Sequence, residues 1–164
     1  MEFIDVSDLV GKIFWMIMKV IDLKNDNTYI DQYLLLRNSY VDLLLTSFVN
    51  ISNTKKWIKR SDIEIRGLVQ DDTLWGVVIL YLRKNGEIAF FVKTPNKGVG
   101  SNLIPIIERV AKQKNLSSIW AWVLEDNMIA QHVFKKNGFK IEGTTKKRLN
   151  GIIKNGIIFR KYIL

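Results

Sequence analysis

The chain has 164 residues, of which 48% are hydrophobic and 25% charged, a balance typical of a single globular domain with a substantial core. Its formal net charge of +9 favours anionic partners such as nucleotide cofactors. The absence of cysteine and the single histidine, His132, exclude disulfides, thiolate catalysis and zinc sites built from Cys or several His. We expect one domain over residues 1–164, no metal and a location in the cytoplasm.

The first half of the chain is predicted to contain a strand, two helical regions and a β-rich stretch. A strand is expected over 12–22, whose apolar part (13–20) is too short to cross a membrane. Apolar residues then recur at helical spacing from Tyr29 to about Leu45, which predicts one bent helix or two short ones. Ser52-Asn53 is expected to cap a short helix that carries Trp57.

Three antiparallel strands are expected next, over residues 63–69, 75–82 and 87–93. Asp71-Asp72 and Asn85-Gly86 mark the turns between them, because Asn, Asp and Gly tolerate the positive φ of tight turns. After this meander the pattern becomes strand-helix-strand-helix, which indicates an α/β domain with a mixed sheet and helices on its faces.

The second half is predicted to hold two helices and three strands. The helices cover residues 98 to about 114 and 127–136, and Gly138 ends the second as a left-handed cap. An apolar strand (119–124) lies between them, and a terminal strand pair (139–149 and 152–164) turns at Asn150-Gly151. The last strand is apolar enough to pair at the edge of a dimer, so the chain is expected to be a monomer or a homodimer.

The most informative feature is the turn Lys97-Gly-Val-Gly-Ser101 between a strand and a helix. Glycine lets backbone amides approach a phosphate, and a helix start offers unpaired N–H groups and the positive end of its dipole. A Rossmann fold would need a longer glycine pattern, and a P-loop would need Gly-Lys-Ser/Thr after four further residues. The sequence therefore indicates either a pyrophosphate site of another kind or an ordinary tight turn.

The surroundings of this turn resemble the GNAT superfamily of N-acetyltransferases. Glu87-Ile-Ala-Phe-Phe-Val92 followed by Gly98-Val-Gly-Ser101 is similar to motif A, and Val123 with Asn127, Ala130, Phe134 and Gly138-Phe139 is similar to motif B. Pro95 stands where motif A usually has arginine or glutamine, a change for which Lys97 is placed to compensate. The resemblance implies a mostly antiparallel mixed sheet that splays between its fourth and fifth strands, with helices on both faces.

The resemblance also implies acetyl-CoA as co-substrate and a set of residues that bind it. The amides of Val99, Gly100 and Ser101 would hold the pyrophosphate, with Lys97 and Gly98 beside them. Backbone groups near Phe91 and Val92 would pair with pantetheine and help to polarise the thioester carbonyl. Asn127, Ala130 and Phe134 would line the same site.

Catalysis by direct attack needs a group that takes a proton from the amine and a group that meets the departing thiolate. Glu87 matches the position of a glutamate base in several family members; its alternative is a solvated residue at the start of a strand. Phe134 stands where many members have a tyrosine acid, so Asn127, Tyr33, Tyr162 or water would act instead. His132 is expected on the surface, and Trp120 and Trp122 in the core or lining a pocket.

Arg37-Asn38 resembles a short element of acetyltransferases that act on nucleotide-linked amino sugars, and its alternative is a helix end capped by asparagine. The acceptor amine is thus expected on an amino-sugar nucleotide. The alternatives are an amine of a protein N-terminus, as in ribosomal-protein acetyltransferases, and a CoA-binding module without catalysis. A nucleic-acid or membrane partner is not expected, because the basic residues are dispersed and the densest cluster, Lys146-Lys147-Arg148, is short.

Overall fold

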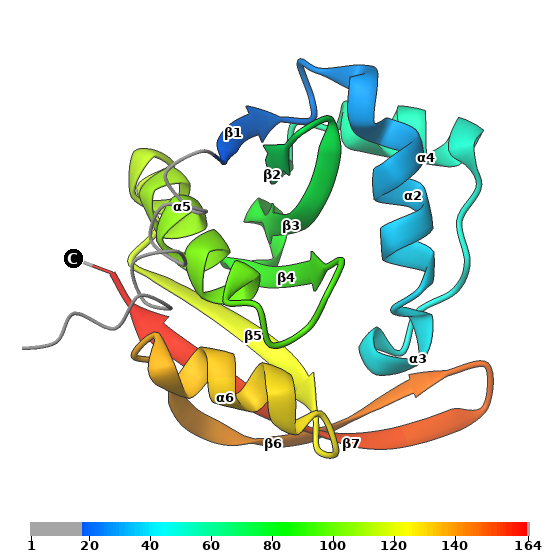
Figure 1. Ribbon diagram of the computed structural model, residues 1–164. Coiled ribbons are helices and arrows are strands. Elements are labelled where there is room, and N and C mark those ends of the chain that lie inside the picture. The colour runs from blue at the N-terminus through cyan, green and yellow to red at the C-terminus, as the bar shows by residue number, and fades with distance from the viewer. Residues whose placement is uncertain (1–17, 164) are drawn as a thin grey trace, which may run out of the picture.

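A computed structural model describes residues 18–163, which form a seven-stranded sheet flanked by helices (Figure 1). The strands are β1 (Lys19–Asp22), β2 (Ile63–Gln70), β3 (Thr73–Tyr81), β4 (Glu87–Val92), β5 (Ser118–Leu124), β6 (Lys140–Leu149) and β7 (Ile152–Tyr162). Their order in the sheet is β1-β2-β3-β4-β5-β7-β6, and the neighbours are antiparallel except for the parallel pair β4 and β5. The mixed, mostly antiparallel sheet expected from the sequence is confirmed.

The helices lie on both faces of this sheet, as predicted. They are α2 (Ile30–Asn38), α3 (Val41–Leu44), α4 (Ile51–Ile58), α5 (Val99–Gln113) and α6 (Met128–Lys136), with short 3-10 turns at η1 (Asn27–Tyr29) and η2 (Leu82–Lys84). Figure 1 shows α2 and α4 on the opposite side of the sheet from α5. Among the described helices, none is long and apolar enough to cross a membrane.

Strand β3 shows why two apolar cores form. Successive side chains of a strand point to opposite faces, so a continuous apolar run supplies both faces at once. Val78 and Leu80 pack into the core beneath α5, whereas Val77 and Ile79 pack into the core beneath α2 and α4. All four side chains are at most 1% exposed.

The N-terminal elements differ from the prediction in detail. Residues 12–17 of the expected first strand lie outside the described part, in which β1 covers Lys19–Asp22. The helical region divides into α2 and α3, the second of the two forms expected. The cap expected at Ser52-Asn53 is wrong, because Asn50 caps α4 and its side chain accepts a hydrogen bond of 2.8 Å from the Asn53 N–H.

The C-terminal elements match the prediction in order and turn chemistry. Gly138 follows α6 with a φ of 83°, and Asn150 and Gly151 join β6 to β7 with φ of 48° and 80°. The terminal strand is not at an edge of the sheet as the dimer hypothesis required, because β7 lies between β5 and β6, paired with β6 over residues 152–160 and with β5 over residues 156–162.

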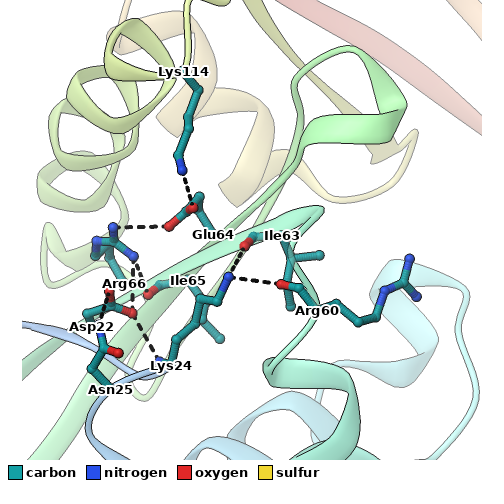
Figure 2. A network of polar contacts seen from close by, with 9 residues as sticks. All are labelled: Asp22, Lys24, Asn25, Arg60, Ile63, Glu64, Ile65, Arg66 and Lys114. Atoms are coloured by element: carbon teal, nitrogen blue, oxygen red, sulfur yellow. Dashed lines mark hydrogen bonds and ion pairs between the residues drawn. The ribbon is translucent and has the colours of Figure 1, made fainter.

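A charged network joins the first half of β2 to β1 and to the end of α5 (Figure 2). The buried carboxylate of Glu64 pairs with Lys114 at 2.8 Å and with Arg66 at 3.1 Å, and Arg66 also pairs with Asp22. Lys24 donates from its Nζ to the carbonyls of Arg60 and Ile63. Burial alone would raise the pKa of Glu64, but the hydrogen bond from Lys114 and the nearby positive charges outweigh it, so the pKa is lowered.

We expect Glu64→Gln to reduce the free energy of unfolding at pH 7 by about 1–2 kcal/mol, since charged hydrogen bonds to a buried carboxylate are lost. A pKa lowered by folding means that ionised Glu64 stabilises the fold above its unfolded pKa, and that this contribution disappears as pH falls through the folded pKa. Urea denaturation should therefore show a larger difference between variant and wild type at pH 7 than near pH 3.

The matched control is Glu142→Gln, which removes a carboxylate from an exposed pair with Arg160 on β7. Exposed ion pairs contribute little, so this variant should unfold like the wild type at both pH values. A Glu64→Gln variant that behaves in the same way would show that the network of Figure 2 does not stabilise the fold.

Candidate acetyl-transfer site

The central feature of the site is a splay between β4 and β5. The two strands share one registered pair, Glu87 with Trp120, and the Trp120 N–H donates to the Gly86 carbonyl at 3.0 Å. Beyond this point β4 stays paired with β3 and β5 stays paired with β7, while β4 and β5 separate. A largely apolar cleft of about 260 Å³ opens between them, lined by residues of both strands and of α6.

The splay leaves backbone groups of β4 without a neighbouring strand. The Lys93 N–H donates to the Trp75 carbonyl on β3, and alternation along the strand makes Phe91 face β3 as well. Phe90 and Val92 therefore turn their N–H and carbonyl groups toward the cleft. The Val92 carbonyl accepts a hydrogen bond of 2.7 Å from the hydroxyl of Tyr40, which also lines the cleft.

Phe91, expected at the cofactor, occupies a different position from Val92. Its side chain is 2% exposed and packs edge-on against the rings of Tyr33 and Tyr40, on the face covered by α2. The backbone pairing expected near Phe91 and Val92 thus falls to Phe90 and Val92 in this geometry.

The glycine turn leads into α5 and borders a second cavity of about 420 Å³. Gly98 has a φ of 76° and caps the helix without a side-chain hydrogen bond, so no side chain of the cap occupies the first-turn N–H groups. At Gly100 an added Cβ would lie 3.1 Å from the Phe90 ring and 3.4 Å from Val133. All five predicted residues of the turn line this cavity: Lys97, Gly98, Val99, Gly100 and Ser101.

Helix α6 forms the opposite wall of both cavities. Asn127 caps this helix, and its Oδ1 accepts a hydrogen bond of 3.1 Å from the Ala130 N–H. Phe134 is 3% exposed and contacts the rings of Phe90, Phe139 and Phe159. Asn127, Ala130 and Phe134 line the cleft together, as the sequence suggested. His132 is exposed, as expected, and borders the cavity at the glycine turn together with Lys136.

A third cavity, of about 320 Å³, lies on the other side of the splay beneath α2 and α4. It has an aromatic wall in which Tyr33 stacks parallel to Trp57, and Tyr81 lies beside Trp57. Glu87 faces it, with a side chain 13% exposed, and pairs with Lys84 at 2.8 Å. We call this space the acceptor cavity, and the space between β4 and β5 the cleft.

The acceptor cavity and the cleft meet at a shared wall. The residues that line both are Leu44, Ile88, Ala89 and Trp122. A molecule in the cleft would therefore lie next to a molecule in the acceptor cavity, at the point where β4 and β5 separate.

The tyrosines of the acceptor cavity are held protonated. Burial raises the pKa of Tyr81 to about 12, and the charge of Glu87 acts in the same direction. Burial likewise raises the pKa of Tyr33, which is 2% exposed. Tyr162, a candidate acid from the sequence, pairs with Ser118 at the start of β5 and is 72% exposed, so it lies away from the cleft.

Arg37 lines the acceptor cavity, but the hydrogen bonds of Arg37 and Asn38 hold the loop beside it. Arg37 donates to Thr46 Oγ1 and to the Ser47 carbonyl, and the Asn38 side chain both donates to and accepts from the backbone of Val49. Asn38 lies inside α2 and Ser39 is its C-cap, so the alternative of an asparagine cap is wrong. The pair shapes one wall of the acceptor cavity, which Thr46 and Val49 line.

The shared wall depends on close packing between Trp122 and Gly156 of β7. An added Cβ at Gly156 would lie 2.1 Å from Trp122 Cε2, far inside van der Waals contact. We expect Gly156→Ala to destabilise the protein by about 1–3 kcal/mol, because the indole must move in a packed site. Guanidinium denaturation followed by tryptophan fluorescence would measure this loss.

Gly143→Ala on the neighbouring strand β6 is the matched control, since an added Cβ there meets nothing within 4 Å. This variant should change stability by a few tenths of a kcal/mol at most. Equal stability of the two variants would show that Gly156 does not set the position of Trp122.

The amino-acid sequence itself matches a known family over this part of the fold. The profile of the acetyltransferase (GNAT) domain matches residues 47–155, which is most of the chain and includes β4, the glycine turn, β5 and α6. The chain belongs to the GNAT acetyltransferase family. No curated protein sequence matches this GNAT chain.

Solved structures share the GNAT fold at low sequence identity. A ribosomal-protein-alanine N-acetyltransferase from Brucella melitensis is 15% identical, with 88% of this chain and 99% of that chain covered and a TM-score of 0.78. A Salmonella typhimurium protein solved with its cofactor acetyl-CoA is 13% identical, with 90% and 94% covered and a TM-score of 0.78. The microcin C7 self-immunity acetyltransferase, in complex with acetyl-CoA and AMP, is 18% identical, with 88% and 93% covered and a TM-score of 0.68.

Several residues of this GNAT site were not predicted from the sequence. Tyr40 lies well before motif A and Lys147 lies after motif B, and only the fold brings them to the cleft and to the acceptor cavity. Lys136 follows His132 by four residues on α6, a helical spacing that could have indicated a shared face. In the described part of the chain, no group of three His, Asp or Glu side chains is arranged to hold a metal ion.

Proposed function

We propose that this GNAT protein transfers an acetyl group from acetyl-CoA to a primary amine by direct attack within a ternary complex. The observation that supports the proposal is the shared wall of the cleft and the acceptor cavity. Two bound molecules can meet there without a covalent enzyme intermediate, and no cysteine exists to form a thioester with the chain.

The glycine turn and the splay fit acetyl-CoA in shape and in hydrogen-bonding groups. Acetyl-CoA supplies the activated acetyl thioester. The first-turn amides of α5, at Val99, Gly100 and Ser101, are placed to hold the pyrophosphate, with Lys97 as a nearby charge. The backbone groups of Phe90 and the N–H of Val92 offer the edge of β4 to the pantetheine amides, and Ala130 and Phe134 line the opposite wall of the cleft.

Glu87 is the group that we propose as the proton acceptor for the amine. Its side chain is largely buried and faces the acceptor cavity, at the end of β4 where the splay begins. The ion pair with Lys84 keeps the carboxylate oriented. A proton accepted by Glu87 directly or through one water would leave the amine neutral for attack.

The departing thiolate needs a hydrogen-bond donor other than Phe134, whose ring carries none. Asn127 already uses its side-chain oxygen as a helix cap, but its amide group is still a potential donor at the cleft. Tyr40 is the stronger candidate, because its hydroxyl lies on the Val92 carbonyl within the cleft and burial raises its pKa. The raised pKa keeps the tyrosine proton in place, so Tyr40 would turn its hydroxyl from the Val92 carbonyl and stabilise the departing thiolate as a hydrogen-bond donor.

For the acceptor, we propose an amino-sugar nucleotide. The parallel rings of Tyr33 and Trp57 offer a stacking surface, and Arg37, Lys84 and Lys147 outnumber the single carboxylate of Glu87 in the cavity lining. The alternative acceptor is a protein N-terminus, which is favoured by the fold shared with ribosomal-protein acetyltransferases. The alternative of a CoA-binding module without catalysis follows from Pro95 and Phe134 in the two motifs.

Thiol release across a panel of amines tests the proposed reaction. The panel should hold amino-sugar nucleotides, peptides with free N-termini and polyamines, with mass spectrometry of each acetylated product. Release that depends on an amino-sugar nucleotide is the expected result. Release only with peptides would move the acceptor to a protein N-terminus, and CoA binding without release on any amine would favour the module without catalysis.

A further inference from the structure

Lys147 extends from β6, the strand that follows motif B, into the acceptor cavity. Its Nζ donates to the Leu44 carbonyl at 3.2 Å and lies 4.9 Å from the ring centroid of Trp122, over the shared wall. The contact with Leu44 joins β6 to the end of α3, and Lys147 lines the cavity itself. An ammonium group can donate three hydrogen bonds, and this contact uses one of them.

The other charged groups of the acceptor cavity are already engaged. Lys84 is paired with Glu87, and Arg37 has no contacting acid but donates to the loop at Thr46 and Ser47. Glu87 is the one carboxylate of the cavity lining, and no ion pair joins Lys147 to a carboxylate within residues 18–163. Lys147 is therefore the one ammonium group of this lining whose charge is not matched by a contacting acid.

We propose that Lys147 binds an anionic group of the acceptor, a carboxylate or a phosphate, while Glu87 receives the amine of the same molecule. This inference rests on the proposed acetyl transfer and makes Lys147 a specificity-determining residue of that reaction. An acceptor with an amine and an anion a few bonds apart would match the two opposite charges of this cavity. A neutral amine or a polyamine would leave the Lys147 charge uncompensated.

The surroundings of Lys147 favour a bound anion, because no carboxylate of the described chain contacts the ammonium group. Burial, the largest cause, lowers the pKa of the Lys147 ammonium below its usual value; the charge of Glu87 opposes this change and the charge of Lys84 adds to it. The face of Trp122 offers a weak attraction for a cation, which is stronger where water is excluded. An anion bound at Nζ would form a charge-assisted hydrogen bond in the same partly desolvated place.

The test compares matched acceptor pairs that differ only in the anion. Glucosamine 1-phosphate against glucosamine probes a phosphate, and phenylalanine against phenylalaninamide probes a carboxylate. The variants are Lys147→Gln and Lys154→Gln, the second an exposed lysine directly across the β6–β7 ladder. We expect Lys147→Gln to lower kcat/KM about tenfold or more for the anionic member of one pair and to spare its neutral partner.

Each outcome decides the inference. A loss confined to the phosphate pair or to the carboxylate pair supports it and identifies the anion, provided that Lys154→Gln behaves like the wild type. Equal losses on anionic and neutral acceptors, or no loss, would overturn it. If no amine is acetylated, the proposed reaction fails, and calorimetry with glucosamine 1-phosphate and phenylalanine on the CoA-saturated protein tests the anion site separately. Binding of either probe that is weakened by Lys147→Gln and not by Lys154→Gln supports the site. Any other result overturns it.

Discussion

Replacing Gly100 by glutamate is expected to weaken acetyl-CoA binding by about 100-fold or more. Gly100 lies buried at the start of α5, where even a Cβ would lie 3.1 Å from the Phe90 ring. A glutamate would have to extend into the cavity beside the glycine turn, and its charge would oppose the phosphates there. Like-charge contacts of this kind cost several kcal/mol, and each 1.4 kcal/mol is about tenfold in affinity. Isothermal titration calorimetry measures the change directly.

The control for this variant is Arg109→Gln, which alters the net charge by the same amount on the exposed face of the same helix. It should bind acetyl-CoA about as well as the wild type. Thermal unfolding of both variants separates loss of the site from loss of the fold. Undiminished affinity in a folded Gly100→Glu protein would contradict the assignment of the glycine turn to the pyrophosphate.

Replacing Glu87 by glutamine is expected to lower kcat by about 10²–10⁴-fold, the usual contribution of a general base. Glutamine keeps the size of the side chain and can still accept a hydrogen bond from Lys84, but it cannot take a proton from the amine. Because Glu87 faces the acceptor cavity and not the cavity beside the glycine turn, acetyl-CoA affinity should stay within about threefold.

Two further variants separate the role of the carboxylate from that of its surroundings. Lys84→Gln removes the ion-pair partner and should cost much less than Glu87→Gln if Glu87 itself takes the proton. Glu125→Gln, at an exposed position after β5, should leave kcat unchanged. A Glu87→Gln protein with nearly full kcat would assign proton transfer to water and return Glu87 to a structural role at the start of β4.

The sequence predicted the second half of the fold well, because local signals there agree with the tertiary structure. The glycine turn, the seven buried residues of α5 and the Asn150-Gly151 hairpin each have a short-range physical cause that is visible in the chain. The first half was predicted less well. The division between α2 and α3 at Ser39-Tyr40 accompanies different packing, since α2 lies against β3, β4 and α4 whereas α3 lies against β5.

The cofactor part of the candidate site was likewise predicted better than the acceptor part. The residues expected at the cofactor lie around the cleft and the glycine turn, since both motifs are local, although alternation along β4 gives the free backbone groups to Phe90 rather than to Phe91. The acceptor cavity could not be predicted, because Tyr33, Trp57 and Lys147 come from three separate regions of the chain. Arg37-Asn38 was recognised as a distinct element, but its partners on the loop at 46–49 are non-local.

Calorimetric titration of the wild-type protein with acetyl-CoA, with 3′-dephospho-CoA and free nucleotides as controls, is the most direct test of the site at the splay of β4 and β5. The geometry predicts saturable one-to-one binding that is tighter for acetyl-CoA than for any nucleotide, with the negative heat-capacity change expected when pantetheine enters the apolar cleft. No binding, or binding equalled by nucleotides that lack pantetheine, would contradict a functional acetyl-CoA site between these strands.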